Sequence, residues 1–164
     1  MRTPLPSSEH LLLTAQLTHF MEDYARCLDQ DDLERWPEFF ADDARYKITT
    51  FDNIRAGYPF GMMYADSAAM LRDRVKALRN ANIYEEQRYR HILGLPFITR
   101  AAVHTVSAQT SFMILRIMRD GQTMLFATGQ YQDSIAIHGD RFQFEERIVV
   151  CDSSQIDTLL ALPL

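Results

Sequence analysis

Residues 137–149 read IHGDRFQFEERIV, and this stretch contains the two signals that decide the fold. His138-Gly139-Asp140 is typical of a tight turn between two antiparallel strands. After the turn, apolar residues alternate with polar ones, and Phe142, Phe144 and Ile148 share one parity. Such alternation is typical of a strand that buries one face. The stretch therefore predicts a β-hairpin whose second strand faces a core.

The same strand-forming character extends back along the chain to about residue 85. Asp120-Gly121 is a second hairpin signal of the same kind. The runs of strand-forming residues between these turns predict four long strands: Tyr89–Thr99, Val103–Arg119, Gln122–Ile137 and Arg141–Asp152.

The first half of the chain has helical periodicity instead. Apolar residues recur every three or four positions from Leu13 to Leu28, which predicts an amphipathic helix capped by Ser7 or Ser8. A shorter helix is expected after Asp31 and Asp32, with an inner stripe of Leu33, Trp36 and Phe40 and a bend at Pro37. The following segments predict a turn at 41–43, a strand at 44–51, a loop at 52–61 and a third helix after Asp66 or Ser67.

Helices followed by a run of antiparallel strands indicate the α+β class. A long curved sheet needs cover on its concave face, and the N-terminal helices can supply it. The expected shape is a cone or half-barrel with room for a pocket. Residues 1–164 are expected to form a single domain, because the length suits one core and no linker or repeat divides it.

Composition excludes several classes of function. Apolar residues make up 47% of the chain and charged residues 24%, as in ordinary globular domains. The net charge of −5 argues against a nucleic-acid partner. The chain contains no run of 18 apolar residues, so no membrane association is expected. The two cysteines, Cys27 and Cys151, match no metal spacing and are typical of free thiols in a reducing compartment, so a cytoplasmic location is expected.

The chemistry-bearing residues point to no complete site. The five histidines form no HxH, HxxxH or HExxH spacing, so no metal is expected in this chain. No nucleophile elbow and no nucleotide-binding fingerprint occurs. A pocket in the cone could still use an acid or base. The candidates for that role are Asp43, Tyr46, Tyr64, His91 and His104. Only His91 stands out, and a core histidine with both nitrogens satisfied is the simpler interpretation of it.

Arg88 and Arg90 precede an apolar run, where unpaired charge is costly to bury. Bidentate contact with a carboxylate would satisfy a guanidinium and fix two elements in register. We therefore expect Arg88 or Arg90 to pair with Asp43, Glu145 or Glu146, inside the fold or across a subunit contact.

Five blocks in collinear order resemble the small (beta) subunits of aromatic-ring-hydroxylating dioxygenases. They cover nearly the whole chain, and the Arg88-Tyr89-Arg90-His91 step in the third block recurs across that family. The blocks are LERWPEFFADDARY (33–46), ADSAAMLRDRVKALR (65–79), NIYEEQRYRHILGLP (82–96), ERIVVCDS (146–153) and DTLLALPL (157–164).

The resemblance implies a nuclear transport factor 2-like, or ketosteroid isomerase-like, cone. It also implies that this chain supports catalysis by another subunit and does not perform it. In this family a large alpha subunit carries a Rieske [2Fe-2S] cluster and a mononuclear iron and dihydroxylates the aromatic ring, whereas the small subunit has no catalytic residues. The small subunit forms a homotrimer within an alpha-three beta-three hexamer. The residues then expected to hold the fold and its subunit contacts are Arg88, Arg90, His91, Glu145, Glu146 and Trp36.

The rival interpretation uses the same cone as a stand-alone enzyme. Ketosteroid isomerases and scytalone dehydratase resemble it and place an acid or base in the pocket. In that case His91, Asp43 and Tyr46 would act on substrate. An open pocket with a water-accessible His–Asp pair would favour this alternative. A filled cone would favour the subunit or a third possibility, a non-enzymatic binding module.

Overall fold

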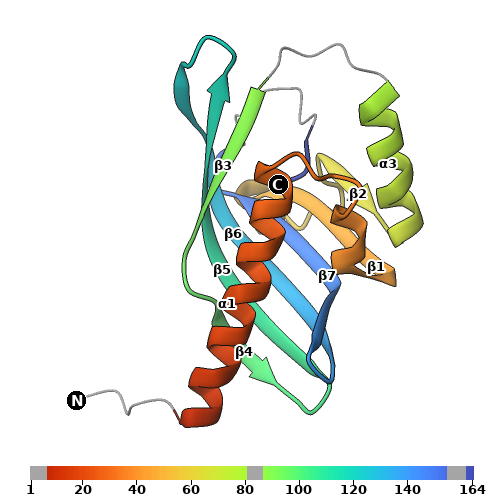
Figure 1. The fold of residues 1–164 in the computed structure, drawn as a ribbon, viewed down its shortest axis with the longest axis vertical. Coiled ribbons are helices and arrows are strands. Elements are labelled where there is room, and N and C mark those ends of the chain that lie inside the picture. The colour runs from red at the N-terminus through yellow and green to blue at the C-terminus, as the bar shows by residue number, and fades with distance from the viewer. Residues whose placement is uncertain (1–6, 81–86, 155–161) are drawn as a thin grey trace, which may run out of the picture.

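The structure is a computed structural model that describes residues 7–80, 87–154 and 162–164 (Figure 1). Its helical elements are α1 (Ser8–Asp29), the 3₁₀ turn η1 (Trp36–Phe39), α2 (Phe51–Arg55) and α3 (Ala68–Asn80). Its strands are β1 (Phe40–Thr50), β2 (Met63–Ala65), β3 (Gln87–Leu93), β4 (Phe97–Ala101), β5 (Thr105–Met118), β6 (Thr123–His138) and β7 (Arg141–Cys151).

The seven strands form one curved sheet in the order β2-β1-β7-β6-β5-β3, and β4 pairs with the other half of β5 (Figure 1). The predicted hairpins are confirmed, since Gly121 and Gly139 take positive φ angles of 88° and 63° in the turns before β6 and β7. The sheet is mixed and not wholly antiparallel, because β1 runs parallel to β7. No hairpin joins these two strands, so chain geometry does not force them to be antiparallel.

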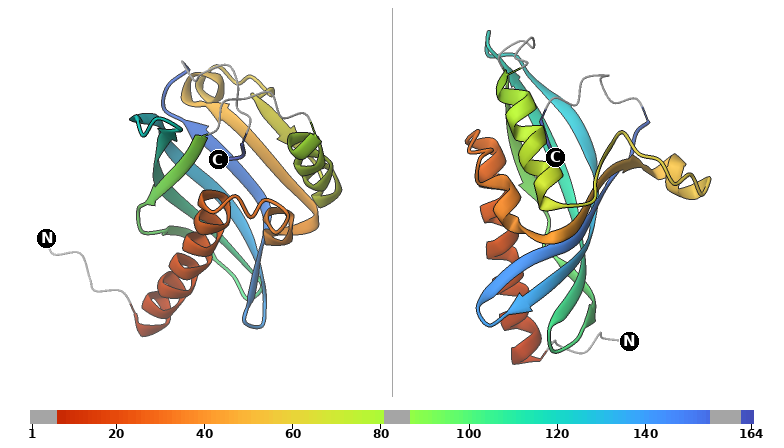
Figure 2. Two further views of the ribbon diagram at one scale, coloured as in Figure 1. Left: turned by 45° about the horizontal axis from the view of Figure 1, so that its top comes forward. Right: turned by 90° about the vertical axis from the view of Figure 1, so that its right-hand side faces the viewer.

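Helix α1 lies across the concave face of the sheet, and α3 covers the part near β1 and β2 (Figures 1 and 2). Ser7 caps α1 by accepting a hydrogen bond from the His10 amide. The apolar stripe of α1, including Leu17 and Met21, is buried against the sheet. The predicted α+β cone is confirmed, with helices packed on a curved sheet.

The predicted helix at residues 31–40 is wrong apart from its last turn. Helix α1 ends in a Schellman motif, in which the Asp32 amide donates to the Cys27 carbonyl and the Asp31 amide to the Leu28 carbonyl. Asp31 takes a φ of 59°, which turns the chain away from the helix axis. Only η1 then forms, with Pro37 in its first turn. The expected turn at 41–43 is part of β1, and the expected loop at 52–61 begins with α2.

Two strands differ from their sequence-based expectation. The predicted strand Tyr89–Thr99 is divided into β3 and β4 at residues 94–96, which contain Gly94 and Pro96. In β7 the pairing with β6 shifts between Phe144 and Glu146, so one additional residue interrupts the alternation. Phe144 faces the core before this bulge and Arg147 faces it afterwards, whereas Ile148 lies on the other parity.

The last described residues pack into the domain. Leu162 is 7% exposed and Leu164 is fully buried. The mostly apolar residues 157–164 of the sequence could dock into this domain or onto another chain, and residues 162–164 dock internally. Residues 157–161 of that stretch lie outside the described residues.

Candidate functional site

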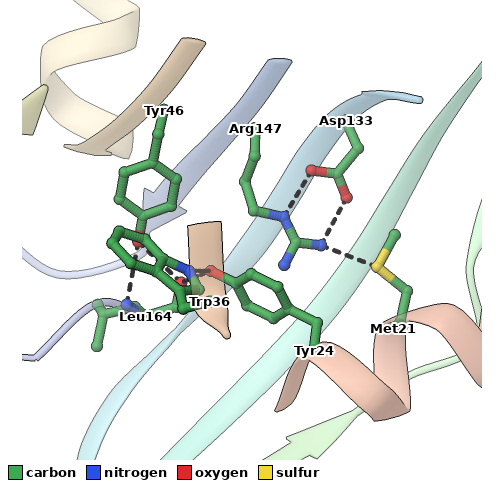
Figure 3. Close-up of polar contacts among 7 residues, drawn as sticks. All are labelled: Met21, Tyr24, Trp36, Tyr46, Asp133, Arg147 and Leu164. Carbon is green, nitrogen blue, oxygen red and sulfur yellow. Dashed lines mark hydrogen bonds and ion pairs between the residues drawn. The ribbon is translucent and has the colours of Figure 1, made fainter. Parts of the chain in front are cut away.

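The interior of the cone contains a buried ion pair that connects α1 to the sheet. Arg147 on β7 and Asp133 on β6 are direct register partners, and both side chains are fully buried. The Arg147 Nε and Nη2 atoms donate to the two Asp133 carboxylate oxygens at 2.8 and 2.9 Å, and Nη2 also contacts the Met21 sulfur at 2.8 Å (Figure 3). The pair is bidentate, which is the strongest geometry for these two groups.

Aromatic rings enclose the same guanidinium. Its central carbon lies 4.2, 4.0 and 3.9 Å from the ring centroids of Tyr24, Tyr131 and Phe144. These contacts are within the range in which a ring face attracts a cation, and they gain strength where water is excluded. Arg147 Nη1 has no hydrogen-bond partner in the described part of the chain, so the rings take the place of one.

Beside this ion pair, hydrogen bonds connect three aromatic side chains with the backbone of Leu164 (Figure 3). The hydroxyls of Tyr24 and Tyr46 both donate to the Leu164 backbone oxygen at 2.9 Å. The Leu164 amide donates to the Tyr46 hydroxyl at 3.0 Å, and the Trp36 indole donates to the Tyr24 hydroxyl at 3.1 Å. Residues from α1, η1, β1 and the end of the sequence therefore meet at one buried point, where three side chains and the Leu164 backbone bond to one another.

The pKa values of these buried groups make them poor proton donors or acceptors near neutral pH. Burial raises the pKa of Tyr46 well above its ordinary value of 10.0, and it also raises the pKa of Tyr24. Burial alone would lower the pKa of Arg147, but the charge and hydrogen bonds of Asp133, together with Tyr24 and Tyr131, outweigh that effect and raise it. An efficient acid or base has a pKa near the working pH, which these groups do not have.

A second polar cluster fixes the sheet edge to the end of α1. Asp29, the last residue of α1, accepts a hydrogen bond from the His91 amide at 3.1 Å and lies 2.6 Å from His91 Nδ1. The His91 side chain is fully buried, and its Nε2 atom has no partner among the described residues. Arg90 approaches the same carboxylate at 4.0 Å from the surface. Asp29 is therefore the residue through which the arginine–histidine motif contacts the helix.

Within the described residues, neither Arg88 nor Arg90 pairs with Asp43, Glu145 or Glu146, and pairing across a subunit contact stays a prediction. Arg90 instead approaches Asp29, which was not among the predicted partners. Glu146 pairs with Arg45 at 2.9 Å, and Glu145 accepts a hydrogen bond from Ser134 at 3.0 Å.

The three residues that a stand-alone enzyme would use do not form one site. His91 lies on the edge strand β3, whereas Tyr46 lies on β1, and β7, β6 and β5 separate these strands in the sheet. Asp43 is exposed on β1. Tyr46 contacts Trp36 and Leu164, so its neighbours are also structural. Of the structural residues predicted, Trp36 is fully buried and Arg88 is exposed.

A groove of about 890 Å³ lies between α1, η1 and the turn that joins β6 to β7. Phe20, Phe39 and Phe142 form its apolar part. Its charged lining residues mix both signs, which is typical of a solvated surface groove: Asp23, Arg35, Glu38, Asp42, Arg72 and Arg141. Among the described residues, no group of three or more histidine, cysteine or acidic side chains could hold a metal. No described helix is long and apolar enough to span a membrane.

The comparisons with known proteins agree with this arrangement. Residues 23–158 match the family model "Ring hydroxylating beta subunit". The chain belongs to the ring-hydroxylating dioxygenase beta subunits. It is 49% identical over 149 residues to beta subunit 1 of the terephthalate 1,2-dioxygenase terminal oxygenase component of Comamonas sp., covering 91% of this chain and 97% of that protein.

Two further relatives support the family assignment. The small subunit of anthranilate 1,2-dioxygenase from Burkholderia cepacia is 35% identical, covering 86% of this chain and 88% of that protein. A crystal structure of the beta subunit assigned to an aromatic-ring-hydroxylating dioxygenase of Novosphingobium aromaticivorans has a TM-score of 0.88 and 35% identity, covering 96% of this chain and all of that one. The resemblance to the family stated from sequence is confirmed.

Sequence analysis missed the residues that organise the interior. Arg147 and Asp133 share a parity with the buried Val149 and Tyr131, so strict alternation counted from the C-terminal end of β7 would have placed Arg147 inside. No local pattern indicated that Asp29 is buried, because a carboxylate in the last turn of a helix is usually solvated.

Proposed function

We propose that this beta subunit is a non-catalytic, structural component of a terminal oxygenase that cis-dihydroxylates an aromatic ring carboxylate such as terephthalate. Its partner is the alpha subunit, which supplies the Rieske [2Fe-2S] cluster and the mononuclear iron. The beta chain acts as one domain in the cytoplasm and forms the homotrimer of an alpha-three beta-three hexamer.

The observation that supports a non-catalytic role is the filled interior of the cone. Large side chains occupy the concave side of the sheet, and Tyr24, Trp36, Tyr46 and Arg147 are each fully buried. The Trp36 and Tyr46 polar groups bond to Tyr24 and Leu164, and Arg147 bonds to Asp133. The remaining Arg147 nitrogen, Nη1, is buried among aromatic rings, so these side chains are occupied by the fold and do not line an open pocket. A pocket enzyme needs the opposite arrangement, a concave apolar space with a few free polar groups.

The nature of the relatives supports the proposed substrate and partner. The first relative is a subunit of a terephthalate 1,2-dioxygenase, and its length is matched almost completely. The anthranilate 1,2-dioxygenase small subunit is named for another ring carboxylate. A protein named as a subunit requires at least one further chain, and the alpha subunit is the one that the family implies.

The test is co-expression with the alpha subunit of the Comamonas terephthalate 1,2-dioxygenase. We expect the two chains to co-purify at equal stoichiometry, with the electron paramagnetic resonance signal of the Rieske cluster only in preparations that contain alpha. Terephthalate dihydroxylation should likewise require alpha. Dihydroxylation or isomerase activity by the purified beta chain alone would contradict the proposal.

The oligomeric state of the purified beta chain tests the proposed trimer separately. Light scattering after size exclusion should give a mass of about three times 19.0 kDa. A chain that remains monomeric at every concentration, with and without alpha, would contradict the homotrimer.

A further inference from the structure

An apolar surface projects from the sheet edge at β2. The chain leaves β1 at Thr50, forms α2 and returns as β2, and this excursion extends away from the body of the molecule (Figure 2, right). Six large apolar side chains on it are between 41% and 80% exposed. This excursion patch consists of Phe51, Ile54, Tyr58, Phe60, Met62 and Tyr64.

The excursion is held against β1 by specific contacts. The Thr50 hydroxyl caps α2 by accepting from the Asn53 amide, and Lys47 Nζ donates to the Pro59 carbonyl at 2.8 Å. The Met62 amide donates to the Ile48 carbonyl at 2.7 Å. A side chain at Gly61 would collide with that same carbonyl. The rings of the excursion patch are therefore held outward by the fold itself.

A second apolar surface lies at the opposite edge of the sheet. The register pairs Ile92 with Met113 and Phe97 with Gln109, which places these residues together on the outer face of β3, β4 and β5. Leu95, in the connection between β3 and β4, is 76% exposed, and Phe97 is 68% exposed. This edge patch consists of Ile92, Leu95, Phe97 and Met113.

Exposed charges that could pair with one another lie beside the two patches. Arg88, Arg90 and Arg100 are exposed on β3 and β4 next to the edge patch. Asp52 and Asp66 are exposed at the two ends of the excursion, where they accompany Arg55. Complementary charge at the rim of an apolar contact selects the partner and its orientation.

We propose that the excursion patch of one copy of this chain docks on the edge patch of a second copy. This inference rests on the proposed homotrimer and assigns its contact surfaces. A contact between two different patches is head-to-tail, and such contacts close into rings when the rotation between copies permits. Patches on opposite edges of one sheet suit this arrangement, because each copy then gives one patch and receives the other.

The excursion patch is large enough to indicate a contact surface. Four aromatic side chains of about 150–250 Å² each, all more than half exposed, give the excursion patch roughly 500 Å² of ring surface. That is at the upper end for the largest patch of a monomer, about 300–600 Å². One such patch is smaller than the roughly 800 Å² per partner of a standard interface. Its aromatic rings and the arginines opposite are the residue types enriched in interfaces.

The test uses two variants that each remove one patch. Tyr58→Ser with Phe60→Ser removes the excursion patch, and Leu95→Ser with Phe97→Ser removes the edge patch. The control is Leu12→Ser, which changes an exposed leucine of α1 outside both patches. All three sets change exposed side chains, so circular dichroism should show the native fold in each. Light scattering then measures the mass of each protein alone and of the two patch variants mixed in equal amounts.

Head-to-tail pairing predicts a specific result for the mixture. Each patch variant alone should be monomeric, because it lacks one half of every contact. When the two variants are mixed, the intact excursion patch of one can bind the intact edge patch of the other. A dimer of about twice 19.0 kDa should then form, but no trimer should form. The control should keep the mass of the unchanged chain.

The alternatives give different masses. Variants that remain trimeric would overturn the assigned surfaces and leave the homotrimer standing. Monomeric variants whose mixture stays monomeric would overturn head-to-tail pairing. An unchanged chain that is monomeric both alone and with alpha would overturn the homotrimer as well, and loss of alpha co-purification in one patch variant would then assign that patch to the alpha subunit.

Discussion

Two arginines of this chain form ion pairs with similar bond lengths in opposite surroundings. Arg147 donates two hydrogen bonds to Asp133 at 2.8 and 2.9 Å, and both side chains are fully buried. Arg79 on α3 donates two to Glu34, at 2.8 and 2.9 Å, and two more to Asp31, but its side chain is 35% exposed and both carboxylates are 62% exposed. Arg79 makes more hydrogen bonds to its carboxylate partners, and yet we expect Arg147 to matter more to stability.

Exposure to solvent explains why the two arginines should differ in their contribution to stability. At the surface, water competes for both charges, and exposed ion pairs contribute about 0–1 kcal/mol. In the interior, desolvation is costly and the partner must offset it, so removing one member leaves an unpaired buried charge. The Arg147 pair is therefore a requirement of the filled cone, whereas the Arg79 cluster ties α3 to the turn after α1 with little net free energy.

The largest expected effect is that of Asp133→Ala. This change leaves the Arg147 guanidinium buried without its carboxylate, and we expect the free energy of unfolding to fall by about 3–5 kcal/mol. Chemical denaturation followed by circular dichroism measures it.

A double variant shows whether the cost comes from the unpaired charge or from lost packing. Asp133→Leu combined with Arg147→Met replaces the pair by apolar groups of similar volume and should restore most of the stability. If Asp133→Ala costs less than 1 kcal/mol, the buried pair is no more important than an exposed one, and the comparison fails.

An intermediate effect is expected for Asp29→Asn. Asp29 is less deeply buried than Asp133, with its side chain 8% exposed, and it holds both the amide and Nδ1 of His91. An amide in its place can accept with one atom only and turns a donor toward one of those groups. We expect a loss of about 1–3 kcal/mol, the cost of leaving a buried group unsatisfied.

Glu22→Gln is the matched control for Asp29→Asn, because Glu22 is exposed on the same helix. It should change the unfolding free energy by less than about 0.5 kcal/mol. Equal effects of the two substitutions would show that the contact between Asp29 and His91 contributes nothing specific.

The sequence predicted the elements whose signals are local. The hairpins at Gly121 and Gly139, the Ser7 cap of α1 and the helix after Ser67 depend on a few adjacent residues, and each is present. The parallel pairing of β1 with β7 depends on contacts between residues about 100 positions apart, which no local pattern encodes.

The site residues were harder to predict for the same reason. Trp36 and His91 were correctly singled out as buried positions, but their partners Tyr24 and Asp29 are fixed by the way α1 crosses the sheet. Arg147 was overlooked because the bulge at Glu145 reverses the alternation on which the sequence analysis relied. A single additional residue thus exchanged the inner and outer faces for the second half of β7.

The smallest expected effect is that of Arg79→Ala. The hydrogen bonds from Arg79 hold the pKa of Glu34 at about 2, below its ordinary value of 4.5. Because the folded pKa is the lower one, this contribution to stability is present above about pH 4.5 and is lost as the pH falls toward 2. Solvent weakens the ion pair, so Arg79→Ala should lower the free energy of unfolding by at most about 1 kcal/mol at neutral pH.

Urea titrations at pH 7 and pH 3 should show a smaller difference in unfolding free energy between the two proteins at pH 3. Raising the salt concentration at pH 7 should also reduce that difference. A cost above 3 kcal/mol that salt does not change would place this cluster with the buried pair, and exposure would no longer separate the two arginines.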